Sequence, residues 1–323
     1  MIITKTPFRM SFFGGGTDIQ EYFAEEGGAV LSTTFDKYCY VNVRHLPGFF
    51  DYSSEFVYNR IERVNSREEI QHPLIRNAVK MLDMENIRLS YEADLPARSG
   101  LGTSSSFAVG MLQAFHAMKG EFPDRRRLAE EAIHLERTLC GEAGGWQDQV
   151  AAAYGGFNKI EFCGNQFSVT PAVISPDKKQ ELNDRLLLFF TGFTRISSEV
   201  QKDNRPASKK AELRALKQLV TEAEQALSEG DLDGFGRLLD SSWQIKRGIG
   251  AKVSTEQIDG LYAKGMAAGA LGGKLLGAGG GGFLLFYAPQ ERIASVRASM
   301  SGLPEIPFRF EETGTELMYS SEA

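Results

Sequence analysis

The sequence has few cysteines, no long apolar run and no excess of basic residues. Its 3 cysteines are an odd number at wide spacing, which gives neither a disulfide framework nor the spacing of a zinc site. Each lies among apolar or small residues, which predicts buried thiols in a reducing compartment. The net charge of −6 argues against a nucleic-acid-binding surface, because such surfaces are usually basic.

The apolar runs are too short for a membrane segment. The N-terminal stretch MIITKTPFRMSFF lacks a long apolar region followed by a cleavage site, and LLLFF at 186–190 is far shorter than a bilayer span. We therefore predict a cytoplasmic protein with a small-molecule substrate and with neither nucleic acid nor membrane as partner. The pattern does not distinguish a monomer from a homodimer.

The periodicity of apolar residues predicts an α+β protein. The chain of 323 residues is long enough for two domains, which we expect at 1–185 and 186–323. Residues rich in β-branched and aromatic side chains predict strands, and amphipathic segments predict helices. The expected strands are 29–46, 51–64 and 87–96; the expected helices are 105–118, 124–139, about 208–228, 231–247 and 254–268; short strands follow around GGKLLGAGGGGFLLFYAP.

The stretch PARSGLGTSSSFAVG, residues 96–110, predicts an anion-binding site. A glycine-rich turn that leads into a helix presents unpaired backbone N–H groups at the positive end of the helix dipole. Gly100 and Gly102 would let the backbone approach a phosphate closely. A helix cap needs only one hydroxyl, so the additional ones favour a metal-bound polyphosphate over the alternative, a capped helix after a tight turn.

Two common nucleotide-binding motifs do not fit. No G-x-x-x-x-G-K-[ST] occurs, which excludes a Walker-type NTPase. A G-x-G-x-x-G does occur at Gly277, Gly279 and Gly282, but FLLFYAP follows and predicts a strand. Because the dinucleotide fingerprint must open a helix, a dehydrogenase is disfavoured.

Three glycine-rich motifs in order resemble those of the GHMP small-molecule kinases. They are TPFRMSFFGGGTD (6–18), PARSGLGTSSS (96–106) and KLLGAGGGGFLLFYAP (274–289), and the resemblance covers about residues 4–311. It implies a ribosomal-protein-S5-like N-terminal domain and a ferredoxin-like C-terminal domain with ATP between them. Within the family, GGGTD and GGWQDQ resemble the sugar 1-kinases that act on heptose 7-phosphate, with the kinase portion of fucokinase as a relative. Galactokinases have Gly-Glu-His-Thr-Asp in place of GGGTD.

The resemblance also implies a role for individual residues. Asp148 would accept the proton of the sugar hydroxyl, and Arg9 would pair with Asp148. Ser104 and Glu136 would hold Mg²⁺. The residues expected to bind ATP are Arg98, Ser99, Gly100, Leu101, Gly102, Thr103, Ser104 and Ser105. Read without the resemblance, Asp148 is equally well a helix N-cap, and Glu136 a solvent-facing partner of an arginine.

The same comparison implies a sugar pocket. The residues expected to bind substrate are Gly14, Gly15, Gly16, Thr17, Asp18, Arg195, Gly279 and Gly280. Asp18 would accept hydrogen bonds from ring hydroxyls, although GGGTD is also compatible with a turn that ends in an N-cap. Arg195 would hold the phosphate tail of the sugar, because arginine binds phosphate with two parallel hydrogen bonds. Arg44 is the alternative for that role.

The resemblance therefore implies an ATP- and Mg²⁺-dependent kinase. Its expected substrate is D-glycero-α-D-manno-heptose 7-phosphate, converted to the 1,7-bisphosphate for nucleotide-heptose and surface polysaccharide synthesis. A fucokinase-like sugar 1-kinase is the alternative within this branch. A non-kinase member, either an ATP-dependent decarboxylase or a sugar sensor, is a further alternative. A sensor would be expected to have lost Asp148, Glu136 or Ser104, and all three are present.

Overall fold

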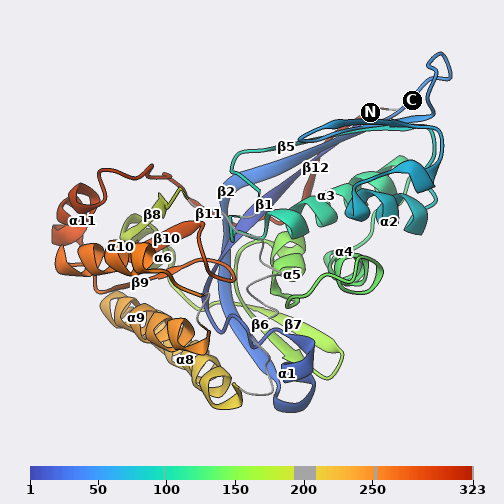
Figure 1. Cartoon of the computed structure of the whole chain (residues 1–323). Coiled ribbons are helices and arrows are strands. Elements are labelled where there is room, and N and C mark those ends of the chain that lie inside the picture. The colour runs from blue at the N-terminus through green and yellow to red at the C-terminus, as the bar shows by residue number, and fades with distance from the viewer. Residues whose placement is uncertain (98, 193–208, 251–252, 322–323) are drawn as a thin grey trace.

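The chain folds around two β-sheets that carry helices on their outer sides (Figure 1). The computed structural model describes residues 1–97, 99–192, 209–250 and 253–321. In this described part, the larger sheet has nine strands and the smaller sheet has three. The α+β class predicted from the periodicity is confirmed.

The larger sheet is built on two long antiparallel strands, β1 and β2. Arg9 of β1 lies opposite Thr34 of β2, between Phe8 and Met10, which are both buried. The path of neighbours runs β12-β1-β2-β5-β3-β4, while β6 and β11 also pair with β2, and β7 pairs with β6. The strands are β1 (Ile2–Phe13), β2 (Gly28–His45), β3 (Ser54–Val57), β4 (Ile61–Val64), β5 (Ile87–Ala93), β6 (Phe157–Cys163), β7 (Gln166–Pro171), β11 (Phe310–Glu311) and β12 (Glu316–Ser320).

Helix α3 (Thr103–Met118) packs against β1 and β2, and nearly all of its residues are buried. This explains why its sequence is apolar on every side rather than amphipathic. Helix α4 ends at Ile133 and continues as a π-helical turn, so the helix predicted over 124–139 is two elements. The other elements of this part are α1 (Gln20–Glu26), η1 (Arg67–Glu69), α2 (Pro73–Met81), α4 (Arg125–Ile133), the π-helical turn η2 (His134–Leu139), α5 (Gln147–Tyr154) and α6 (Pro176–Asp184).

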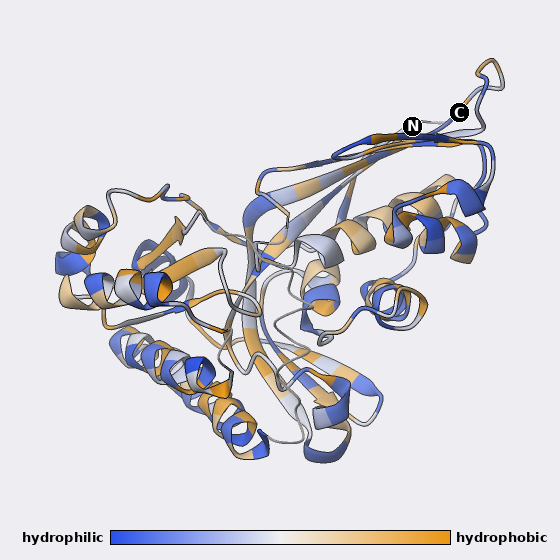
Figure 2. Cartoon of the chain, viewed as in Figure 1, coloured by the Kyte–Doolittle hydropathy of each residue, from blue (hydrophilic) through white to orange (hydrophobic). Residues whose placement is uncertain are grey.

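Helices α9 and α10 pack against β9 of the smaller sheet, whereas α8 packs against α9 and against β1 and β2 of the larger sheet. Figure 2 shows that α8 and α9 carry hydrophilic residues along one side and hydrophobic residues along the other. Leu216, Val220 and Leu227 of α8 are buried, as the 3.6-residue period predicts. The elements are β8 (Leu186–Phe190), α8 (Lys210–Glu229), α9 (Leu232–Ile249), α10 (Glu256–Ala267), β9 (Gly272–Leu275), β10 (Phe283–Tyr287), η4 (Gln290–Arg292) and α11 (Ile293–Ser299).

The end of the chain returns to the larger sheet. Strand β12 pairs with β1, β11 pairs with β2, and the amino group of Met1 donates to the carbonyl oxygen of Ser321. Residues 310–320 therefore belong by strand pairing with the first sheet, not with the rest of the expected 186–323 domain. The boundary at 185 stays a prediction.

Two smaller expectations need correction or comment. Only Cys39 is buried, whereas Cys140 is half-buried and Cys163 is exposed, because Cys163 ends β6 beside the turn to β7. The stretch 51–64 forms the hairpin β3–β4 rather than one strand. Within the described residues, no helix is long and apolar enough to span a membrane.

Candidate active site

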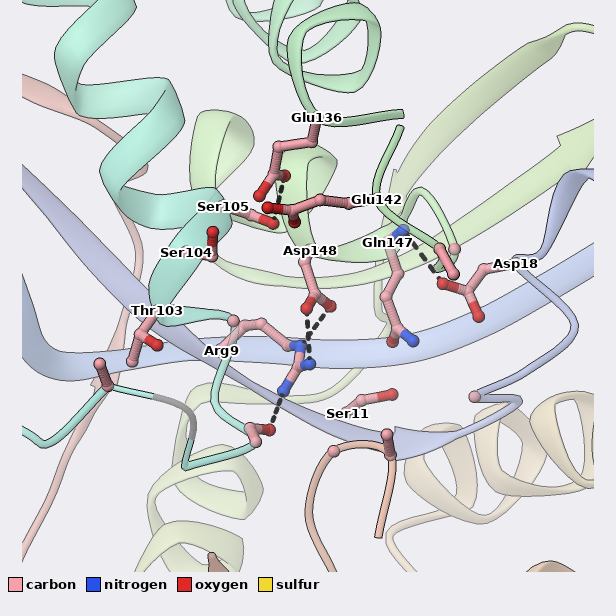
Figure 3. Close-up of a pocket in the computed structure, with 18 of the residues that line it drawn as sticks. Arg9, Ser11, Asp18, Thr103, Ser104, Ser105, Glu136, Glu142, Gln147 and Asp148 are labelled. Carbon is pink, nitrogen blue, oxygen red and sulfur yellow. Dashed lines mark hydrogen bonds and ion pairs between the residues drawn. The ribbon is translucent and has the colours of Figure 1, made fainter. Parts of the chain in front are cut away.

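A cavity of about 820 Å³ lies where elements of both sheets meet. Its wall includes the end of β1, the loop after β1, the start of α3 and the start of α5 on one side. Residues of α9 and the glycine-rich loop after β9 form the other side. Figure 3 shows the polar side chains of the first group pointing into this cavity.

The loop before α3 has the geometry of a phosphate-binding cradle. Gly100 and Gly102 have φ of +84° and +76°, which L side chains rarely adopt. A Cβ atom on Gly100 would lie 2.4 Å from the carbonyl oxygen of Leu276. Gly102 is the N-cap of α3 and no side chain caps the helix, so its first N–H groups are available to an anion. These features fit the triphosphate of ATP.

The other residues of the predicted ATP loop divide into two groups. Thr103, Ser104 and Ser105 line the cavity with Gly100 and Gly102. Ser99 and Leu101 are fully buried and are not part of the cavity wall, and the carbonyl oxygen of Leu101 accepts a hydrogen bond from the Arg9 backbone N–H. Arg98 lies outside the described residues.

Arg9 and Asp148 form a bidentate ion pair in the cavity wall (Figure 3). Arg9 Nε donates to Asp148 Oδ1 at 2.7 Å, and Nη2 donates to Oδ2 at 2.8 Å. The third nitrogen, Nη1, donates to the carbonyl oxygen of Gly100 at 2.7 Å. One guanidinium therefore fixes the carboxylate relative to the phosphate loop, which is the pairing that the sequence comparison implies.

Glu136 is 1% exposed and its carboxylate faces Ser105 (Figure 3). Ser105 Oγ donates to Glu136 Oε2 at 2.7 Å, and Gln149 Nε2 donates to the same oxygen. Oε1 accepts no hydrogen bond from the described residues. The solvent-facing alternative for Glu136 is therefore wrong, because the π-helical turn directs the side chain inward.

The donor set around Glu136 fits a magnesium ion. Ser104 is exposed to the cavity at the start of α3, so a hydroxyl and a carboxylate oxygen are available. Mg²⁺ prefers such oxygen ligands, completed by phosphate oxygens and water. Glu142 also lines the cavity beside Glu136, and burial together with the charge of Glu136 raises the pKa of Glu142.

Asp18 lies beyond Gln147 on the same wall (Figure 3). Asp18 Oδ1 accepts a hydrogen bond from the Gly16 N–H at 2.9 Å, and Oδ2 accepts one from the Gln147 N–H at 3.2 Å. Burial and the nearby charge of Asp148 raise the pKa of Asp18. Gly15 and Gly16 line the cavity beside Asp18, as expected.

Four of the predicted substrate residues lie behind the cavity wall. Thr17 is fully buried and its hydroxyl bonds within the turn, to the carbonyl oxygens of Gly14 and Ala29 at 2.8 Å. A Cβ on Gly14 would lie 1.9 Å from the Ala29 carbonyl oxygen, so this glycine is required by packing. Similarly, a Cβ on Gly279 would lie 2.6 Å from the carbonyl oxygen of Val253. The N–H of Gly280 donates to that same oxygen at 3.0 Å.

Two arginines are candidates for binding the phosphate tail of the sugar. Arg195 lies outside the described residues. Arg44 is half-buried on β2 beside Arg88 of β5 and is not part of the cavity wall. Lys209, which lies just before α8, is a described cation in the cavity wall. It is near the Asp18 end of the cavity, because Leu213 of α8 is 3.2 Å from the position of a Cβ on Gly16.

Two lysines in the cavity wall were missed by sequence reasoning. Lys274 of β9 is 2% exposed, and its Nζ donates to the carbonyl oxygen of Phe12 at 2.5 Å. Burial, with the charges of Lys246 and Arg9, lowers the pKa of Lys274. Lys246 of α9 donates to the carbonyl oxygen of Gly277. A lone lysine in an apolar strand could have identified Lys274, but nothing in an amphipathic helix singles out Lys246.

Aromatic rings form another part of the wall that the sequence did not indicate. Tyr58 contacts His72, and Phe107 contacts both His72 and Tyr91, with centroid distances of 4.6 to 6.0 Å. These rings come from four separate segments, so no local pattern reveals them. Such a surface suits a flat heterocycle beside the phosphate loop.

Comparisons with known proteins identify the family of the chain. The family models "GHMP kinases N terminal domain" and "GHMP kinases C terminal" match residues 72–156 and 223–303. The chain is 30% identical to D-glycero-alpha-D-manno-heptose 7-phosphate kinase of Campylobacter jejuni over 92% of both proteins. It is 27% identical to the bifunctional fucokinase/GDP-fucose pyrophosphorylase of Arabidopsis thaliana, over 88% of this chain and 29% of that protein.

Solved structures show the same fold. The crystal structure of a D-glycero-D-manno-heptose 1-phosphate kinase from Bacteroides thetaiotaomicron aligns over 100% of both chains, with 25% identity and a TM-score of 0.82. A putative sugar kinase from Campylobacter jejuni aligns over 98% of this chain and 97% of its own, with 29% identity and a TM-score of 0.78. The chain belongs to the GHMP kinases, a family of ATP-dependent small-molecule kinases.

Proposed function

We propose that this GHMP-family sugar kinase transfers the γ-phosphoryl group of ATP to the anomeric hydroxyl of D-glycero-α-D-manno-heptose 7-phosphate. The product would be the 1,7-bisphosphate, a precursor for nucleotide-activated heptose and surface polysaccharide. The observation that carries the proposal is the shared cavity, in which the phosphate loop, the Arg9–Asp148 pair and Asp18 lie on one wall. The similarity to the Campylobacter jejuni kinase favours a heptose phosphate.

Asp148 is the proposed proton acceptor. As the sugar oxygen bonds to the γ-phosphorus and the bond to ADP breaks, the hydroxyl proton would pass to an Asp148 oxygen. Arg9 holds both of these oxygens from one side, so the carboxylate cannot rotate away from the reacting hydroxyl. The Arg9 charge also offsets negative charge that develops on the transferring group.

Ser104 and Glu136 are the proposed magnesium ligands. The ion would neutralise phosphate charge and hold the triphosphate in line with the acceptor. Ser105 and Gln149 both donate to Glu136 Oε2, which fixes the carboxylate with Oε1 left for the cation. Proteins usually orient a metal ligand in this way, by hydrogen bonds from neighbouring side chains to the ligand.

The sugar would bind between Asp18 and Asp148. Ser11 Oγ and Gln147 Oε1 are buried on this wall, and neither has a hydrogen-bond partner among the described residues. A buried polar atom without a partner costs free energy, and ring hydroxyls of a sugar would supply the missing bonds. Asp18 would accept a bond from another hydroxyl. Lys209 and Arg195 are the proposed partners of the 7-phosphate.

A substrate panel tests the proposal. ADP release is measured with heptose 7-phosphate, unphosphorylated heptose, L-fucose and D-galactose, and ³¹P NMR identifies the position of the new phosphate. We expect heptose 7-phosphate to give the highest kcat/KM and a product phosphorylated at the anomeric carbon. A preference for L-fucose would instead support the fucokinase-like alternative, which the Arabidopsis thaliana relative favours.

A further inference from the structure

Lys246 occupies a position in the cavity wall for which the proposed roles give no explanation. It lies in the last turn of α9 (Leu232–Ile249), is half-buried and lines the cavity. A basic residue in a last turn can serve simply to offset the helix dipole. Arg247, the next residue, fits that description, because it pairs with Asp259 at 3.5 Å and is not part of the cavity wall. The Lys246 side chain instead turns to the cavity.

The contact made by Lys246 places it at the phosphate loop. Its Nζ donates to the carbonyl oxygen of Gly277. Gly277 in turn touches the loop so closely that a Cβ atom on it would lie 2.4 Å from Gly100 Cα. Arg9 Nη1 donates to the Gly100 carbonyl oxygen. Lys246, on a helix that packs against the smaller sheet, and Arg9, on a strand of the larger sheet, therefore both reach the Gly100–Gly277 contact.

The charges around Lys246 leave room for an anion. Four groups act on it: the Arg9 guanidinium of β1, the buried amine of Lys274 in β9, whose pKa burial lowers, and the carboxyl groups of Asp18 after β1 and Asp148 of α5. The negative charge of Asp148 is already balanced by its ion pair with Arg9. Two lysines thus face the catalytic end of the cavity with one further carboxylate, Asp18. Basic groups that are buried close together disfavour each other's charged forms, and an anion bound between them would stabilise those forms.

We propose that Lys246 binds the terminal phosphoryl group of ATP and holds it from the side opposite the start of α3. ATP and the sugar's own phosphate both present a phosphate dianion. ATP is favoured because Lys246 is bonded to Gly277, which packs against Gly100 of the phosphate loop. Lys246 is then a catalytic residue that contacts the transferring group. This inference depends on the ATP-dependent kinase activity and is independent of which sugar is phosphorylated.

The protonation of Lys246 gives the inference a pH signature. Burial and the charge of Arg9 lower the pKa of Lys246 to about 8. A bound phosphate raises the pKa of an adjacent amine, so above pH 8 ATP binding takes up a proton. ATP affinity therefore falls as the pH rises through about 8, and below that pH Lys246 is already charged and no proton is taken up.

Nucleotide binding without sugar tests the inference. Titration calorimetry compares Mg²⁺-ATP with Mg²⁺-ADP for the wild type and for Lys246→Met, Lys246→Gln, Lys246→Arg and the control Arg247→Gln. We expect Lys246→Met and Lys246→Gln to bind ATP about 10- to 100-fold more weakly and ADP within about 2-fold of the wild type. Lys246→Arg keeps most of the ATP affinity, and Arg247→Gln keeps all of it. Proton uptake at pH 8.5, measured in buffers of different ionisation enthalpy, disappears in Lys246→Met.

Two outcomes would overturn the inference. Equal losses of ATP and ADP affinity would show that Lys246 only tethers Gly277. Unchanged ATP affinity, with a higher KM for phosphorylated but not for plain sugars, would assign Lys246 to the sugar's own phosphate. Circular dichroism and thermal unfolding report the folding of each variant separately, so a misfolded protein is not mistaken for a loss of nucleotide affinity. Because no sugar is present in these titrations, their result is separate from that of the substrate panel.

Discussion

Arg9 and Asp148 are joined by two hydrogen bonds of 2.7 and 2.8 Å, and Arg9 makes a third, of 2.7 Å, to the Gly100 carbonyl oxygen. The Arg9 guanidinium thus donates hydrogen bonds both to the proposed proton acceptor and to the phosphate loop, which fixes the position of one relative to the other. A lysine could not replace this arginine, because an ammonium group cannot make two parallel bonds to a carboxylate and also reach a carbonyl in the same plane.

Asp148→Asn is the direct test of the proton acceptor. The amide keeps the shape of the side chain but cannot take up the proton, so kcat should fall by about 10² or more. ATP affinity should change little, because the side-chain hydrogen bonds of Asp148 within the described residues go to Arg9 and not to the phosphate loop. Steady-state kinetics and ATP titration of the folded variant check both statements. Turnover close to that of the wild type would show that another base acts, or that none is needed.

Ser104→Ala and Glu136→Gln test the proposed metal site. Each variant should raise the Mg²⁺ concentration needed for half-maximal activity. The double variant should lose less than the sum of the two single losses, because both residues would act on one ion. A Mg²⁺ titration of the four proteins gives the coupling. Strict additivity would mean that only one of the two side chains contacts the metal.

Gly100→Ala tests how closely the phosphate loop approaches the glycine-rich loop after β9. Gly100 and Gly120 have similar φ, +84° and +74°, but a Cβ on Gly100 would meet the Leu276 carbonyl oxygen at 2.4 Å, whereas one on Gly120 meets nothing within 4 Å. Gly120→Ala therefore measures the backbone cost alone, about 1–2 kcal/mol. Gly100→Ala should lower the free energy of unfolding by more than this and should also abolish ATP binding. Chemical denaturation of both variants gives the difference, and equal losses would contradict the proposed contact.

The parts of the site that could be predicted from sequence are those in which one short segment carries the chemistry. Gly100 and Gly102 before a helix indicate a phosphate site by themselves, and Arg9 stands out as a lone charge in an apolar strand. Gly14 shows the limit of this reasoning. Glycines demanded by a ligand and glycines demanded by a neighbouring carbonyl, here that of Ala29, have the same appearance in a sequence.

The other features of the fold and of the site depend on contacts between segments that are far apart in the sequence. Nothing local indicates that β12 returns to β1, or that Lys246 bonds to Gly277 beside the phosphate loop. Glu142 is similar, because the chain must fold back after the π-helical turn for the Glu142 N–H to donate to the Glu136 carbonyl oxygen. The lone-charge argument that identified Arg9 applies equally to Lys274 and would have found it, since both are single cations within buried strands.

The last prediction concerns the phosphate that the proposed sugar already carries. A dianionic tail must be held away from the charges of ATP, and this requires a cation at the Asp18 end of the cavity. Lys209 lines the cavity just before α8, which begins without a side-chain cap beside Gly16. Lys209→Met should therefore raise KM for heptose 7-phosphate by about 10-fold and leave KM for ATP and for unphosphorylated heptose nearly unchanged, since one charge-assisted hydrogen bond is lost. Arg195→Ala should act in the same direction. Lys217→Met is the matched control, because Lys217 of the same helix donates to the Glu26 carbonyl oxygen instead. If neither Lys209→Met nor Arg195→Ala separates the two sugars, the tail is not bound at this end, and a substrate without a second phosphate becomes the better proposal.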